Sequence, residues 1–231
     1  MLSMKNIKIF ILLLVLSFCA CSSNKAAVPV KEEFIVSLDS RQVELGVIEG
    51  QLHTTPLLPM LKKSGITVIY FPEEDAVCLR YKMELYTFHQ FWSYSGREEF
   101  LKALEKYNKD FTDRNLKKGG ARKSKRSYGT VEGYLIWQLA AITIRARANV
   151  NLEMGYAFAQ RSPYFTINQR EAEFEHAFDR SNNRTSSQIP IYFTRAQAAE
   201  LAALFDPDLL STILPEPIRR IEPTDVDYDE Y

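Results

Sequence analysis

The feature that most restricts the fold is a long run of alternating apolar residues between Ile142 and Phe158. Every second residue in this run is apolar, without a break in phase: Ile142, Ile144, Ala146, Ala148, Val150, Leu152, Met154, Tyr156 and Phe158. A period of two residues gives a β-strand one apolar face, whereas an amphipathic helix needs a period of about 3.6 residues. The run is longer than most strands. Either the strand is long and strongly bent, or a turn near residues 149–151 preserves the phase.

Other segments show similar β-type patterns. Val77 to Leu85 alternates between apolar and polar residues, as a strand with one buried face does. Shorter apolar or β-branched segments predict further strands at residues 34–38, 43–48, 66–71, 131–138, 164–170 and 189–193. The strands predicted at residues 131–138, 142–158 and 164–170 follow one another, with a turn expected at Arg161-Ser162-Pro163, which indicates an antiparallel meander.

Two segments have the pattern of amphipathic helices. At residues 96–113, Ser95 and Glu98 form a capping box, and apolar residues recur on one face: Phe100, Leu104, Tyr107 and Phe111. At residues 195–205, Thr194 and Gln197 form a second capping box. Asp206-Pro207 is expected to stop this helix and to cap one further turn.

The order strands, helix, strands, helix predicts an α+β fold: a curved antiparallel sheet or partial barrel of about seven strands, packed by two helices. The chain has 231 residues, of which 46% are hydrophobic, so it can bury one full core. We expect a single globular domain at residues 33–214. Lys plus Arg equals Asp plus Glu at 29 each, so no net charge draws the molecule toward nucleic acid.

The N-terminus has the layout of an export signal. Lys5 and Lys8 precede an apolar run at residues 9–16, which is too short to span a membrane as a helix. The following residues, Ser17-Phe18-Cys19-Ala20-Cys21-Ser22-Ser23, place a small residue before a cysteine. This segment resembles the relaxed lipobox of spirochaetal lipoproteins, which implies lipidation at Cys21. The residues leave open Cys19 as the modified residue, or an ordinary cleaved signal with incidental cysteines.

The resemblance implies a palmitate-bearing lipoprotein of the cell envelope, with a signal peptide at residues 1–20 and a polar tether at residues 21–32. Ser22 is not the Asp that retains lipoproteins in the inner membrane, so the outer membrane is the expected destination; which face the domain occupies is left open. The acidic segment at residues 215–231 is predicted to be a disordered tail. Cys78 lies in an apolar strand pattern and is expected to be a buried small hydrophobe.

A basic loop at residues 117–126 is one candidate site for anionic surfaces such as lipid headgroups or glycans. Its cations are Lys117, Lys118, Arg122, Lys123, Lys125 and Arg126. No aromatic residue is interleaved with them, which argues against nucleic-acid binding. An ordinary solvated loop between a helix and a strand has the same composition, and we favour that interpretation.

An aromatic-rich stretch before the first predicted helix is a second candidate. Tyr86, Phe88 and Trp92 are predicted to line an apolar ligand pocket if the curved sheet encloses one. The competing interpretation is that these rings form ordinary core where a strand meets a helix.

Neither a metal site nor a catalytic constellation is predicted. His53, His89 and His176 lack the spacing of a zinc site, and the acidic residues near His176 fit a charged surface equally well. The sequence contains no Gly-x-Ser-x-Gly elbow, phosphate-binding loop or dinucleotide motif. Arg145 and Arg147 share one strand face; on the inside of a barrel they would indicate an anionic ligand, but we expect the solvent face.

These observations predict a non-enzymatic binding or interaction module on a membrane-anchored lipoprotein, without a cofactor. Its candidate partners are the membrane through the lipid anchor, and an envelope protein, glycan or lipid. The alternative is a carrier that holds a small apolar or lipid ligand within the curved sheet. The two hypotheses differ in one structural respect, because only the carrier requires a cavity.

Overall fold

The computed structural model describes residues 36–53, 61–118, 126–139, 145–159, 161–173 and 185–213. The chain divides into two compact units at residues 1–33 and 34–231, and all described residues lie in the second. The predicted signal peptide, the whole tether and the acidic tail therefore lie outside the described residues.

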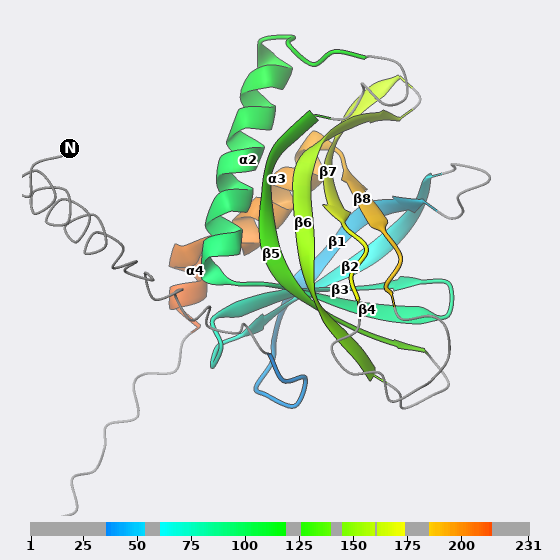
Figure 1. The fold of residues 1–231 in the computed structure, drawn as a ribbon. Helices are drawn as coiled ribbons and strands as arrows, with labels where there is room; N and C mark the ends of the chain where they lie inside the picture. The colour runs from blue at the N-terminus through cyan, green and yellow to red at the C-terminus, as the bar shows by residue number, and fades with distance from the viewer. Residues whose placement is uncertain are drawn as a thin grey trace, which may run out of the picture. The chain divides into compact units, whose positions relative to one another are not determined.

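Eight antiparallel strands form a closed barrel in which each strand pairs with the next along the chain (Figure 1). The strands are β1 (Val43–His53), β2 (Leu61–Phe71), β3 (Ala76–Met83), β4 (Tyr86–Trp92), β5 (Arg126–Leu139), β6 (Arg145–Ala159), β7 (Ser162–Gln169) and β8 (Ile189–Phe193). Pairing of β1 with β8, through Gln51 with Tyr192 and Leu52 with Ile191, closes the barrel. The antiparallel sheet packed by helices is as expected, but the curved sheet or partial barrel of about seven strands is in fact a closed barrel of eight.

The predicted and the observed strands differ at two segments. Tyr86–Trp92 was not predicted as a strand because it is buried on both faces, and so it lacks the alternation of a half-buried strand. Conversely, the predicted strand at residues 34–38 is not a strand over its described part, residues 36–38. The long run beginning at Ile142 is one continuous strand from Arg145 to Ala159, without a turn near residues 149–151.

Three helices are described: α2 (Tyr94–Thr112), α3 (Arg195–Leu204) and α4 (Pro207–Ser211). The predicted Ser95 capping box is wrong, because Ser93 caps α2 and its hydroxyl accepts a hydrogen bond from the Gly96 amide. The Thr194–Gln197 capping box of α3 is confirmed. Asp206 caps α4, with Pro207 in its first turn, as the sequence predicted.

The interior of the barrel is filled by an apolar cluster to which all eight strands contribute, and we call it the interior cluster. The apolar faces of α2 and α3 belong to the same cluster through Phe100, Leu104, Tyr107, Ala198 and Leu201. Because α2 packs on β5 and β6, and α3 packs on β1, β7 and β8, the helices seal the interior from one side (Figure 1). Strands β4 and β5 also approach closely, since a Cβ added at Gly133 would lie 2.8 Å from the Phe91 carbonyl oxygen.

A second, smaller apolar cluster lies on the outer face of β2 to β5. Its members are Val36, Ile69, Phe71, Ala76, Cys78, Phe91, Tyr134 and Ile136, with Leu38 packed against them. The chain before β1 thus contributes to covering this outer face. Cys78 is fully buried here, and burial raises the pKa of its thiol, which makes it the inert apolar residue that the sequence predicted.

Candidate functional site

The barrel wall opens between β2 and β3, where the two strands diverge. They pair from Phe71 with Ala76 to Thr67 with Arg80. Beyond this point β2 continues to Leu61 in its pairing with β1, while β3 continues to Met83 in its pairing with β4. In Figure 1 the β1–β2 and β3–β4 hairpins separate on the right-hand side.

A cleft of about 980 Å³ occupies this opening. It is lined by residues 62–65 and 67 of β2 and residues 80–84 of β3, together with Leu52, Thr87, His89 and Gln138. Residues paired directly across two antiparallel strands point to the same side, so Leu52 and its partner Lys62 lie on the inner side of the wall. Lys82 and its partner Thr87 lie on the outer side. The cleft therefore has walls from both faces of the sheet. Its volume is at the upper end of the range for small-molecule sites.

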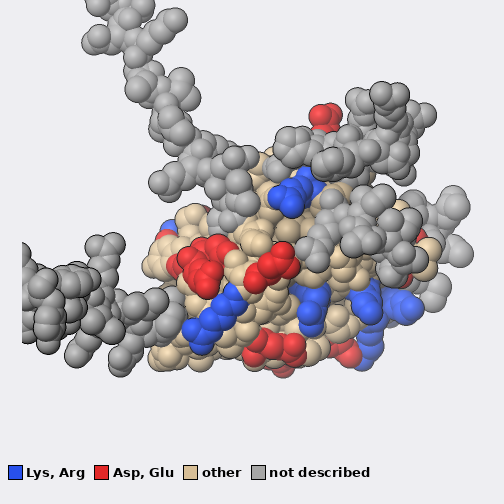
Figure 2. Space-filling view, turned by 90° about the horizontal axis from the view of Figure 1, so that it is seen from below, with Lys and Arg blue, Asp and Glu red and all other residues tan. Residues whose placement is uncertain are grey.

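The walls of the cleft carry four cations, and two of them have acidic partners. Lys63 binds Glu49 of β1 at 2.8 Å, which raises the pKa of Lys63, and Arg80 lies 3.7 Å from Glu44 of β1. Lys62 on β2 and Lys82 on β3 are exposed, and no described carboxylate pairs with either. Glu84 is the one acidic residue among the lining residues that the structure describes. Figure 2 shows Lys and Arg side chains on the side where the hairpins project, with acidic side chains between them.

Apolar and aromatic side chains lie at the inner side of the cleft. Leu52 and Tyr81 are buried there, Met83 is partly buried, and the Tyr81 ring stacks on Phe88 with 5.5 Å between centroids. Beside Met83, at the tip of the β3–β4 hairpin, Leu85 is 68% exposed. The cleft thus combines two cations, Lys62 and Lys82, that have no described acidic partner with an apolar inner side, which we call its floor. The exposed Leu85 adds an apolar side chain beside the opening.

Polar groups deeper in the barrel satisfy one another. The Tyr81 hydroxyl donates to Gln169 Oε1 at 2.9 Å, and Gln90 Nε2 donates to the same oxygen at 3.2 Å. Trp92 Nε1 donates to Gln90 Oε1 at 3.1 Å, and Gln169 Nε2 donates to the Ser187 carbonyl oxygen at 3.4 Å. Burial also raises the pKa of Tyr81, so its hydroxyl stays protonated as a donor. Since these buried groups bind each other, the cleft rather than the lumen offers polar groups to a ligand.

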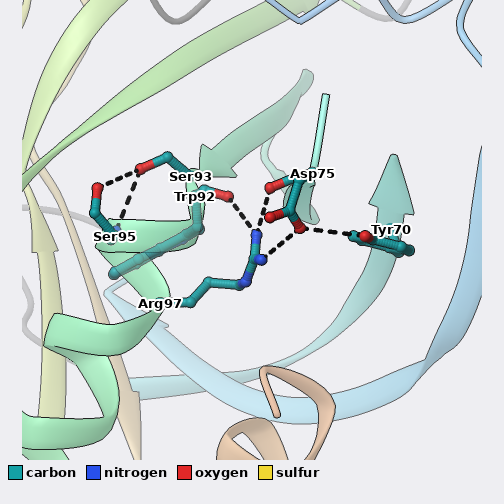
Figure 3. Close-up of polar contacts among 7 residues, drawn as sticks. Tyr70, Asp75, Trp92, Ser93, Ser95 and Arg97 are labelled. Carbon is teal, nitrogen blue, oxygen red and sulfur yellow. Dashed lines mark hydrogen bonds and ion pairs between the residues drawn. The ribbon is translucent and has the colours of Figure 1, made fainter. Parts of the chain in front are cut away.

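A second polar cluster lies at the start of α2, where Arg97 is almost fully buried (Figure 3). Its guanidinium donates to the Asp75 carboxylate at 2.6 Å, to the Asp75 carbonyl oxygen at 2.6 Å and to the Trp92 carbonyl oxygen at 3.4 Å. Tyr70 donates to the same carboxylate at 3.1 Å, and burial together with Asp75 raises the pKa of Tyr70 to about 12. The cluster joins α2 to the β2–β3 turn. The Nη1 and Nη2 donors of Arg97 are directed at protein acceptors, which indicates a structural role, whereas its buried Nε has no hydrogen-bond partner among the described residues.

Comparison with known protein families gives a match over most of the chain. The model of a family described as "Uncharacterised Treponema protein" matches residues 31–212. The chain belongs to this family. The matched range contains the whole barrel and the helices α2, α3 and α4, so the fold described above is that of the family domain. A Treponema family is consistent with the spirochaetal resemblance of the N-terminal signal, although the match does not reach that segment. No curated protein and no solved structure gives a match.

The three aromatic residues predicted to line a pocket lie on the inner face of β4 in this family member. Phe88 and Trp92 are buried in the interior cluster, where Trp92 contacts Phe100 and Phe205. Tyr86 is 39% exposed at the rim of the barrel and is paired with the cleft residue Met83. The lining of the cleft does not include these three side chains, but Phe88 supports it through Tyr81.

The other predicted site residues are described only in part. Lys117 donates its backbone N–H to the Tyr156 hydroxyl at 3.2 Å, and Lys118 is exposed. Arg122, Lys123 and Lys125, like Cys21, lie outside the described residues, and so does the side chain of Arg126. Arg147 is exposed on the outer face of β6, as expected, whereas the side chain of Arg145 is not described.

Within the described ranges, no group of three or more His, Cys, Asp or Glu side chains is placed to hold a metal ion. His89 lines the cleft on the outer face of β4, while the side chains of His53 and His176 are not described. None of the helices in the described part of the chain has the length and apolar character needed to cross a membrane.

The sequence held only a partial signal for the cleft. Arg80, Lys82 and Glu84 occupy the polar positions of an alternating run, so their place on the outer face could be predicted. The pair Lys62-Lys63 has no such pattern around it. That these cations line one cleft depends on where β2 and β3 stop pairing, which is a property of the barrel and is not visible in either strand alone.

Proposed function

We propose that this protein is a non-enzymatic binding module whose site is the cleft between β2 and β3 and whose ligand is a small molecule. The observation that carries the proposal is the cleft itself: an opening of about 980 Å³ in a barrel whose strands bury a large apolar cluster. Concave sites of this size, with an apolar floor and a few polar groups at defined positions, are typical of small-molecule binding.

The chemistry of the lining supports binding rather than catalysis. Among the described lining residues, four side chains are cations and Glu84 is the one carboxylate. They therefore do not supply the pair of carboxylates that glycoside hydrolysis uses. The cations of the cleft can attract a negatively charged part of a ligand, and its apolar side can hold an apolar part. Such binding requires no covalent step.

The proposal retains the envelope location inferred from the N-terminal signal. In this account Cys21 carries the lipid, residues 22–32 form the tether, and the barrel binds its ligand close to a membrane, which we take to be the outer one. Labelling of cells with a radioactive fatty acid tests the anchor. The label should be lost in Cys21→Ser and kept in Cys19→Ser, and the reverse pattern would move the anchor to Cys19.

Filling the cleft should abolish binding of a small apolar probe. Ser64 is partly buried on β2 and lines the opening, so Ser64→Trp places an indole ring within it. Nile red, a neutral dye that fluoresces in apolar surroundings, is the probe, and the protein is residues 25–231, which contain the whole second unit. We expect wild type to enhance the dye fluorescence and Ser64→Trp to reduce the enhancement at least about fivefold, since the ring excludes the dye from its site.

The matched control is Thr130→Trp, which adds the same ring at an exposed position of β5. It should leave the dye signal unchanged. Thr67→Trp, at the last pairing position of β2 with β3, provides a second way to fill the cleft if Ser64→Trp does not fold. Unfolding curves establish that each variant is folded. Equal dye signals in wild type and both cleft variants would refute the proposal.

A further inference from the structure

The arrangement of charge in the cleft bears on the chemical class of the ligand. Lys63 and Arg80 are partly neutralised by Glu49 and Glu44, whereas Lys62 and Lys82 have no acidic partner among the described residues. An exposed lysine on a solvated surface needs no partner. These two, however, extend from the two strands that form opposite walls of one cleft.

The unpaired lysines approach the cleft from its two sides. Lys62 is paired with the buried Leu52 and lies on the inner side of the wall, while Lys82 is paired with Thr87 and lies on the outer side. A negatively charged group placed in the opening is therefore flanked by cations on both sides. Lys ammonium groups bind carboxylates and phosphates as point charges with rotatable donors, so the site does not require one fixed head-group geometry.

The rest of the cleft is suited to an alkyl chain. Leu52, Tyr81 and Met83 form its apolar side, and the exposed Leu85 at the hairpin tip continues the apolar surface toward solvent. Leu85 is among the most exposed large hydrophobic side chains of the described residues, so its surface is accessible to a ligand chain that leaves the cleft.

Resting on the proposed function, we infer that the ligand is an anionic amphiphile: a single alkyl chain with a carboxylate or phosphate head group. Its head group lies between Lys62 and Lys82, and its chain lies against Leu52, Tyr81 and Met83. The sequence analysis gave a carrier of a small apolar or lipid ligand as an alternative function. The inference restricts that ligand to anionic lipids and places it in the barrel wall instead of the lumen.

The test is displacement of Nile red from residues 25–231 by four matched amphiphiles below their micelle-forming concentrations. Dodecanoate and dodecyl phosphate carry the two anionic head groups, dodecanol is neutral, and dodecyltrimethylammonium is cationic. We expect one or both anions to displace the dye at least about tenfold more effectively than dodecanol, with the cation weakest. The better of the two anions identifies the head group.

Matched lysine variants connect the preference to the cleft. Lys62→Met and Lys82→Met retain an unbranched side chain without the charge, and each should weaken anion binding about tenfold. Lys63→Met should have a smaller effect, because Glu49 already neutralises that charge. Lys106→Met, at an exposed position of α2 away from the cleft, should have none. The advantage of the anions over dodecanol should also diminish at high salt.

The outcomes separate this inference from the proposed function. Equal displacement by dodecanol and the anions, or anion binding unchanged in Lys62→Met and Lys82→Met, would overturn the anionic ligand while leaving the cleft as a binding site. If Nile red binds but none of the four amphiphiles displaces it, the anionic ligand is likewise overturned and the cleft remains a binding site. Failure of Nile red itself to bind the wild-type protein would refute the proposed function and, with it, the inference.

Discussion

Replacement of Phe100 by alanine should lower the free energy of unfolding by about 3–5 kcal/mol, the range for truncating a fully buried aromatic side chain. Phe100 is completely buried in α2, and its ring contacts Trp92, Phe165 and Phe205 at centroid distances of 5.8, 5.6 and 4.9 Å. It therefore joins α2 to the barrel and to the end of α3. Its loss leaves a cavity where three elements meet.

Phe111→Ala is the matched control for Phe100→Ala, because Phe111 lies on the same apolar stripe but is only partly buried in the last turn of α2. Its truncation should cost about 1 kcal/mol. Denaturant unfolding followed by far-ultraviolet circular dichroism measures both variants. If Phe100→Ala and Phe111→Ala lower the free energy of unfolding by similar amounts, Phe100 does not anchor α2 to the barrel.

Replacement of Asp75 by asparagine should cost about 3 kcal/mol, because it leaves the Arg97 guanidinium buried without its counter-charge. The Arg97 side chain is 1% exposed and that of Asp75 is 46% exposed, so the arginine is the desolvated partner. Asp75 has φ +45°, in the left-handed region that asparagine also tolerates. The substitution therefore changes the charge without straining the turn.

A double variant distinguishes this explanation from simple loss of a contact. If a buried, unpaired charge causes the instability, removing the charge as well should restore part of the stability. We therefore expect Asp75→Asn with Arg97→Met to unfold at higher denaturant than Asp75→Asn alone. If the two substitutions lower the free energy of unfolding additively, or if Asp75→Asn lowers it by less than about 1 kcal/mol, Asp75 does not compensate the charge of the buried Arg97.

Much of the secondary structure could be predicted from local sequence patterns. The alternating run of β6 and the capping box of α3 are properties of consecutive residues, and both are as expected. β4 was missed because its two faces pack on two clusters: Phe88 and Trp92 on the interior cluster and Phe91 on the outer one. A strand buried on both sides has no alternation to detect.

Barrel closure and the cleft could not be predicted, for a common reason. Closure depends on β1 meeting β8, two strands at opposite ends of the domain that pair at Gln51 and Leu52. The cleft depends on β2 and β3 diverging beyond Thr67 and Arg80. Both are consequences of strand register and tilt in three dimensions, which individual sequence segments do not specify. The aromatic residues of β4 were not assigned to a strand, and so their place relative to a cavity could not be predicted either.

Native mass spectrometry tests directly whether the opening between β2 and β3 binds a small ligand. Residues 25–231 are incubated with a total lipid extract, separated from unbound lipid, and compared with Ser64→Trp treated in the same way. We expect a reproducible added mass on the wild-type protein that disappears on denaturation and is absent from the folded Ser64→Trp variant. A bare mass for wild type, or the same added mass on both proteins, would contradict it.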